Sequence, residues 1–138
     1  MKPRRYAERT VVPVDRSRTE FEQLLRKYKA TQFGFFEDDE GTTVIFRLQD
    51  RMVRQRIPQP QVSKNRLEAE RRRRWRALLL ITKAKLELIG SGDSTFEREF
   101  LADLMLSNGK TVMEEAGPQI VEQYSKGVKT PLLLGGGP

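Results

Sequence analysis

The stretch Lys64–Ile89 most constrains the fold, because it runs for 26 residues without a glycine or a proline. An uninterrupted segment of this length predicts a single helix of roughly 39 Å, at 1.5 Å per residue. Its first half is basic and its second half is apolar, since KNRLEAERRRRWR precedes ALLLITKAKLELI. We therefore predict that this helix is both the scaffold of the fold and the main contact surface.

Positive charge is concentrated in the same part of the chain. The whole sequence has 26 Lys/Arg and 19 Asp/Glu residues, for a formal net charge of +7. Residues 51–90 hold twelve Lys/Arg and three Asp/Glu, whereas residues 91–138 hold four and seven. Such a local excess predicts a dedicated basic surface and favours polyanionic partners. The acidic C-terminal third could also fold back and neutralise that surface.

The sequence contains no cysteine and no histidine, which removes several kinds of site. Disulfides, thiolate zinc sites, cysteine nucleophiles, Ser-His triads and histidine-ligated zinc are excluded. No apolar run follows the first charges, so no signal peptide is predicted, and the longest apolar run, Ala77–Ile81, is too short to cross a bilayer. We expect a cytoplasmic protein that has no membrane partner.

The chain is predicted to form one domain of the α+β class. We expect a three- to four-stranded antiparallel sheet in the order β-α-β-β-β, with one long helix and two short C-terminal helices. The parts are a basic leader (1–9), the β-α-β-β-β unit (10–57), a linker (58–63), the long helix (64–89), a helical C-terminal part (94–126) and a flexible tail (127–138).

The first helix is expected at Ser17–Ala30, after a short edge strand at Thr10–Val14. Ser17 and Glu20 form an S-x-x-E capping box, in which each side chain satisfies a free backbone N–H. Apolar residues recur at helical spacing and predict the face that packs on the core. They are Phe21, Leu24, Leu25 and Tyr28.

Three strands with alternating apolar residues follow, at Gln32–Glu37, Thr42–Leu48 and Arg51–Ile57. One face of their sheet is apolar and should meet the first helix. The other face mixes apolar groups with arginines: Phe36, Ile45, Arg47, Met52, Arg54 and Arg56.

Two arrangements of this mixed face are open. The long helix could cover it while the arginines reach water, which we favour because exposed apolar area forfeits roughly 25 cal/mol per Å² of burial energy. Alternatively, the face could stay open as a nucleic-acid platform, with bases on Phe36 and phosphates on the arginines.

The long helix is expected to begin at an N-x-x-E pattern formed by Asn65 and Glu68, and its apolar half to be contacted by the sheet and by later helices. Two capped helices follow, at Ser94–Leu106 and Thr111–Lys126. The second should break or kink at Gly117-Pro118, because proline removes a helical hydrogen bond. Its inward residues are expected to be Ile120, Val121 and Tyr124.

Three segments, VPVDRSRTEFEQLLRKY, RWRALLLITKAKLE and STFEREFLADLMLSNGKTV, resemble a family of small proteins encoded by bacteriophages and prophages. The resemblance spans most of Glu8–Leu134. That family has no assigned function, so the resemblance implies no active residue. It implies the cytoplasm of a bacterial host, and the phage tasks of handling nucleic acid or subverting a host protein.

The clustered arginines, Arg71–Arg74 and Arg76, form the main candidate site. Five arginines in six positions surround the helix, so they cannot all face a core, and the planar guanidinium suits phosphate. One interpretation is a phosphate-contacting helix, and another is a docking surface for an acidic host protein. Trp75 within the cluster is expected to anchor the core rather than stack on a base. A third interpretation is a solvated face paired with Glu97, Glu99, Asp103, Glu114 or Glu115.

The sequence therefore predicts a non-catalytic nucleic-acid-binding accessory protein of phage origin, with no metal and no cofactor. The alternatives are a phage protein that binds and modulates a host enzyme, aided by Leu132–Leu134, and a metal-dependent nuclease built on the C-terminal carboxylates. The residues predicted to contact the phosphates of DNA or RNA are Arg54, Arg56, Lys64, Arg66, Arg71, Arg72, Arg73, Arg74 and Arg76.

Overall fold

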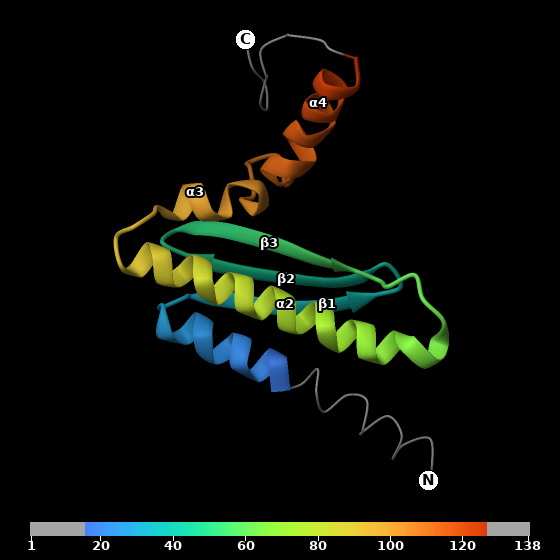
Figure 1. The fold of residues 1–138 in the computed structure, drawn as a ribbon. Helices are drawn as coiled ribbons and strands as arrows, with labels where there is room; N and C mark the ends of the chain where they lie inside the picture. The colour runs from blue at the N-terminus through green and yellow to red at the C-terminus, as the bar shows by residue number, and fades with distance from the viewer. Residues whose placement is uncertain (1–15, 127–138) are drawn as a thin grey trace.

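The computed structural model describes residues 16–126 and confirms the predicted α+β class. Strands β1 (Gln32–Asp38), β2 (Gly41–Leu48) and β3 (Arg51–Pro58) form an antiparallel sheet in that order. The strand expected at Thr10–Val14 and the leucines at 132–134 lie outside the described residues. Beside the sheet are a first helix (residues 16–27), α2 (Lys64–Gly90), α3 (Phe96–Phe100), the 3-10 turn η1 (Leu101–Asp103) and α4 (Val112–Lys126), as Figure 1 shows.

Two tight turns set the register of the three strands. In the first turn, Asp38 Oδ1 accepts hydrogen bonds from the backbone N–H groups of Glu40 and Gly41, at 2.8 and 3.1 Å. Gly41 has a φ of +137°, and a Cβ there would lie 2.2 Å from the Ile57 carbonyl oxygen, so only glycine fits. In the second turn, Gln49 and Asp50 both have positive φ, as a type I′ hairpin requires.

The core lies between one face of the sheet and two helices. The first helix contributes Phe21 and Leu25, and α2 contributes a buried stripe that begins at Trp75. The Trp75 ring lies 6.4 Å from Phe21 and 5.6 Å from Phe35, measured between ring centroids. The prediction that Trp75 anchors the core is confirmed, and its burial removes it from any base-stacking role. The buried residues of the sheet are Thr42, Val44, Phe46, Leu48, Val53, Gln55 and Ile57.

The favoured prediction that the long helix covers the mixed face of the sheet is wrong. Figure 1 shows the first helix and α2 side by side along the sheet. Both pack on the apolar face, because α2 buries Leu79, Thr82 and Leu86 in the same core as the first helix. The three strands present enough apolar area for two helices on that side, so no described helix is left to cover the other face.

Three predicted N-caps are wrong, and the helix predicted at Ser94–Leu106 is shorter, since α3 and η1 end at Asp103, and Leu104 and Met105 form β-bridges. Ser17 lies inside the first helix rather than at its N-cap, and α2 begins after Ser63 rather than at Asn65. The N-cap of α3 is Thr95, whose hydroxyl accepts a hydrogen bond from the Arg98 backbone N–H. For α2 and α3, the capping pattern occurs in the sequence, but the local backbone begins the helix at a neighbouring position.

The capping box that begins α4 is confirmed in both directions. The Thr111 backbone N–H donates to Glu114 Oε1 at 2.7 Å, and the Glu114 backbone N–H donates to Thr111 Oγ1 at 3.1 Å. The predicted break at Gly117-Pro118 is wrong, since α4 continues through Pro118 to Lys126.

The packing predicted for the C-terminal helices is only partly correct. Phe96 and Phe100 of α3 enter the core, and the chain after η1 joins the edge of β3 through a 2.9 Å bond from the Met105 N–H to the Met52 carbonyl. However, α4 projects away from the sheet (Figure 1), so its expected inward residues are exposed. These residues are Ile120, Val121 and Tyr124.

The apolar half of α2 contacts the sheet and a later helix, as predicted, since the Lys85 ammonium lies 5.3 Å from the Phe100 ring centroid of α3, but its outer face is uncovered. Leu79 is buried in the core, whereas Leu80 and Ile81 are 51% and 52% exposed.

None of the helices in residues 16–126 is long and apolar enough to cross a membrane.

Candidate nucleic-acid interface

The basic half of α2, defined as residues 64–76, presents an unusual density of positive charge. It contains seven Lys/Arg residues and two glutamates, and none of the seven cationic residues is buried. Because arginines occur at nearly every angle around the helix axis, only some of them can contact the rest of the protein. The cationic residues are Lys64, Arg66, Arg71, Arg72, Arg73, Arg74 and Arg76.

Four of these arginines form ion pairs within the described residues. Arg71 contacts Glu37 of β1 at 2.9 Å and Glu68 at 3.2 Å. Glu70 accepts from Arg73 at 2.5 Å and lies 3.7 Å from Arg74. The remaining pair joins Arg76 to Glu20 of the first helix, at 3.3 Å.

The acidic partners are therefore not those that the sequence suggested. The solvated-face interpretation paired the clustered arginines with carboxylates from residues 97–115. Two of those carboxylates instead hold arginines of β3, in the pairs Arg51–Glu97 and Arg54–Glu114. Among residues 16–126, the basic half of α2 is paired only with carboxylates of its own helix, of the first helix and of β1.

These partners do not neutralise the basic half of α2. Only four of the seven cationic side chains, Arg71, Arg73, Arg74 and Arg76, contact carboxylates within residues 16–126, and the partners are Glu20, Glu37, Glu68 and Glu70. Lys64, Arg66 and Arg72 make no ion pair and no side-chain hydrogen bond within residues 16–126. Exposed ion pairs contribute only about 0–1 kcal/mol each. A phosphate can therefore displace Glu20 from Arg76 at little cost, because both of these side chains are exposed.

The charge of the cluster is also visible in the ionisation of Glu70. The hydrogen bond from Arg73 holds the pKa of Glu70 below its ordinary value of 4.5, and it outweighs the opposing effect of burial. The charges of Arg73, Arg74 and Arg66 lower the pKa further. An anion that approaches this part of the helix experiences the same favourable potential.

A groove of about 280 Å³ between the first helix and α2 extends this surface. Its lining includes three cations, Lys27, Arg76 and Lys83, and one carboxylate, Glu20. Arg76 belongs both to the groove and to the basic half of α2, so the two features are continuous. Sequence reasoning missed Lys27 and Lys83, because they come together only when both helices pack on one face of the sheet.

Arg54 and Arg56 lie elsewhere, on the face of the sheet that α2 does not cover. Arg54 donates to the Gly109 carbonyl at 3.2 Å and pairs with Glu114. Arg56 donates to Thr43 Oγ1 at 2.9 Å and pairs with Glu40 at 3.3 Å. The nine residues of the predicted site therefore form two separate surfaces.

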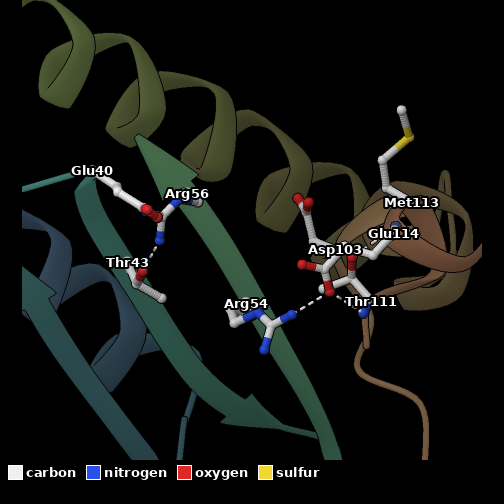
Figure 2. Close-up of a pocket in the computed structure, with 8 residues that line it drawn as sticks. All are labelled: Glu40, Thr43, Arg54, Arg56, Asp103, Thr111, Met113 and Glu114. Carbon is white, nitrogen blue, oxygen red and sulfur yellow. Dashed lines mark hydrogen bonds and ion pairs between the residues drawn. The ribbon is translucent and has the colours of Figure 1, made fainter. Parts of the chain in front are cut away.

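Arg54 and Arg56 line a cleft of about 480 Å³ between β3 and the start of α4. Figure 2 shows both guanidinium groups on the near side of the strands, with α2 passing behind. The other lining residues are Glu40, Thr43, Asp103, Thr111, Met113 and Glu114.

Comparison with known proteins adds no family to this description. No family model matches the chain, and neither a curated protein nor a solved structure does. Within residues 16–126, no group of three acidic side chains is arranged to hold a metal ion.

Proposed function

We propose that this protein is a non-catalytic nucleic-acid-binding protein, which contacts phosphates through the basic half of α2 and the adjoining groove. The observation that carries the proposal is the imbalance on this surface, where only four of the seven unburied cations are paired with carboxylates in the described residues. Arginine fits this role because its guanidinium donates two parallel hydrogen bonds to phosphate.

The arrangement of these cations favours binding that depends only weakly on the nucleotide sequence. The cations surround the helix instead of forming one narrow row, and phosphate contacts carry no direct information about the bases. The resemblance to phage-encoded proteins is consistent with a nucleic acid in a bacterial host as the partner. DNA and RNA are both compatible with this surface, because both present the same phosphate charge.

A charge-matched comparison tests the proposal. The triple variant Arg72→Ala/Arg73→Ala/Arg74→Ala should lose most affinity for fluorescently labelled DNA and RNA oligonucleotides, measured by anisotropy at low salt. The control variant Arg98→Ala/Lys110→Ala/Lys126→Ala removes the same charge from the C-terminal part of the chain and should keep the affinity. Equal losses of affinity in the two variants would show that binding depends on net charge alone, which would contradict a localised site.

A second candidate function, binding of a host protein, is favoured by a different observation. The outer face of α2 carries an exposed apolar stripe formed by Leu80, Ile81 and Leu88, flanked by Ala77 and Ala84. Contiguous exposed apolar groups of this kind often belong to protein-binding surfaces. This function would be supported over the first by a host protein that stays bound after nuclease treatment. Its binding should be lost in Ile81→Asp but kept in the α2 triple variant.

A further inference from the structure

The uncovered face of the sheet is a three-by-three array of side chains, which we term the open face. Strand pairing aligns them in three rows: Gln32–Arg47–Met52, Gly34–Ile45–Arg54 and Phe36–Thr43–Arg56. None of the nine residues is buried, whereas the opposite face holds seven buried ones. No described helix lies over this face, and η1, the segment after it and the start of α4 flank it on the β3 side.

Phe36 is held on this face in a position suited to stacking. Its side chain is 59% exposed, although it lies in a regular strand. A Cβ atom on Gly34 would lie 3.1 and 3.2 Å from two atoms of the Phe36 ring, so the ring rests across the backbone of Gly34. The absence of a side chain at position 34 lets the ring lie low on the sheet, and its exposed part remains available to a planar group.

Arg47, on the central strand, is a cation without an internal partner. It makes no ion pair within residues 16–126, and its Nε is buried with no hydrogen-bond acceptor. A buried donor on a charged group that lacks a partner costs free energy until an acceptor arrives. An anionic oxygen from outside the protein would neutralise the charge of this guanidinium group.

Arg54 and Arg56 add two further cations on the neighbouring strand. Phe36 and Arg56 share a row on strands that are two apart, so their backbones are separated by about 10 Å. The acidic partners of Arg54 and Arg56 are surface groups, which a phosphate can displace. The open face thus combines one exposed ring with three arginines, the two kinds of group that bind bases and phosphates.

We propose that the open face binds a single-stranded segment of nucleic acid, with a base stacked on Phe36 and phosphates on Arg47, Arg54 and Arg56. This inference rests on the proposed function and names its partner class. In a duplex the bases stack on each other and their flat faces are not accessible, whereas a single strand can turn a base onto an aromatic ring. The basic half of α2 recognises phosphates in either form, and the open face supplies the preference for single strands.

The test uses the full-length protein and three probes: a single-stranded oligonucleotide, the corresponding duplex, and the same single strand with abasic sites. We expect the single strand to bind more tightly than the duplex. Phe36→Ala should weaken binding of the single strand about 5- to 150-fold, as expected for one lost stacked base. The same variant should leave binding of the duplex and of the abasic strand unchanged.

Two matched controls separate stacking and charge from general surface effects. Tyr124 of α4 is also an exposed aromatic residue, and Tyr124→Ala should not alter the preference. Arg47→Ala should weaken binding of the single strand, whereas Arg98→Ala, which removes an exposed arginine of α3, should not. Phe36→Leu keeps an apolar side chain without a ring and should behave like Phe36→Ala, with unchanged thermal unfolding for both variants.

The outcomes distinguish this inference from the proposed function. If Phe36→Ala and Arg47→Ala keep the wild-type preference while the α2 triple variant loses all binding, the open-face proposal is overturned and the phosphate-binding surface stands. If the wild-type protein binds none of the three probes at low salt, the proposed function itself fails. Loss of the single-strand preference in both Phe36→Ala and Phe36→Leu, but not in Tyr124→Ala, supports the open face.

Discussion

Gln55 of β3 donates a hydrogen bond of 3.2 Å from its side-chain amide to Thr82 Oγ1 of α2, and both residues are buried in the core. The bond joins the sheet to the middle of the long helix in a region that is otherwise apolar. It also explains why a glutamine occurs at a strand position that faces the core. The pairing orients α2 on this face and so leaves the opposite face open.

Removal of one partner of this hydrogen bond should destabilise the fold. Thr82→Val keeps the shape of the side chain but leaves the Gln55 amide buried without an acceptor, and we expect a loss of about 1–3 kcal/mol in the free energy of unfolding. The double variant Gln55→Leu/Thr82→Val removes both polar groups and should recover most of that loss. Denaturant unfolding measures the free energy of unfolding of each variant, including the single variant Gln55→Leu. A loss in the double variant equal to the sum of the losses in the two single variants would contradict this account.

Adjacent leucines of α2 should differ sharply in their contribution to stability. Leu79 is 4% exposed and Leu80 is 51% exposed. Leu79→Ala should therefore lower the free energy of unfolding by about 2–5 kcal/mol, as for other buried leucines. Leu80→Ala should change it by no more than about 0.5 kcal/mol. Similar losses in the two variants, measured by urea denaturation, would show that the outer face of α2 is covered in the folded protein.

Glu114 should make the protein sensitive to acid. The backbone N–H of Thr111, helped by Arg54 and opposed by burial, holds the pKa of Glu114 below its ordinary value of 4.5. A carboxyl whose pKa is lower in the folded state stabilises the fold at neutral pH, and this stabilisation is lost as the pH falls from 4.5 through the folded pKa. Glu114→Gln should be less stable at pH 7 and should lose less stability in acid.

The control for this prediction is Glu87→Gln, since Glu87 makes no side-chain ion pair within residues 16–126. Thermal unfolding of the three proteins between neutral and acidic pH provides the comparison. A Glu114→Gln curve parallel to that of the wild type across this range would mean that Glu114 does not titrate differently in the two states.

Asp103 should act in the opposite direction. Burial raises the pKa of Asp103 above its ordinary value of 3.8, against a smaller lowering effect from Lys85. The folded state therefore binds this proton more tightly than the unfolded state, and the contribution of Asp103 to stability falls as the pH rises from 3.8 through the folded pKa. Asp103→Asn should remove this dependence and stabilise the protein at neutral pH. A destabilised Asp103→Asn variant at pH 7 would argue against an unfavourable buried charge.

Local patterns were enough to predict several parts of the fold. Alternation of apolar residues located the three strands, and the capping pattern of Thr111 and Glu114 located a helix start. Each of these features depends on neighbours within a few residues, so the sequence contains the necessary information. The core role of Trp75 followed from helical spacing in the same way.

The arrangement of α2 could not be predicted from such patterns. Leu79, Leu80 and Ile81 are equally apolar, and only the packed structure decides which of them is buried. The partners of the arginines also depend on tertiary position, because Arg71 meets Glu37 and Arg76 meets Glu20 across long stretches of sequence. The sequence allowed the mixed face of the sheet to be either open or covered by the long helix. Which of the two occurs depends on the side of the sheet on which α2 packs.

The most direct test of the central claim is the salt dependence of nucleic-acid affinity between 50 and 200 mM salt, a range over which phosphate contacts have large effects. The plot of log affinity against log salt has a negative slope, and its steepness decreases by about 0.9 for each duplex phosphate contact removed and by about 0.7 for each single-strand contact removed. We predict a steep slope for the wild-type protein and a slope shallower by about two to three in the variant Arg72→Ala/Arg73→Ala/Arg74→Ala. A flat response of the wild type, or an unchanged slope in the variant, would contradict phosphate binding by the basic half of α2.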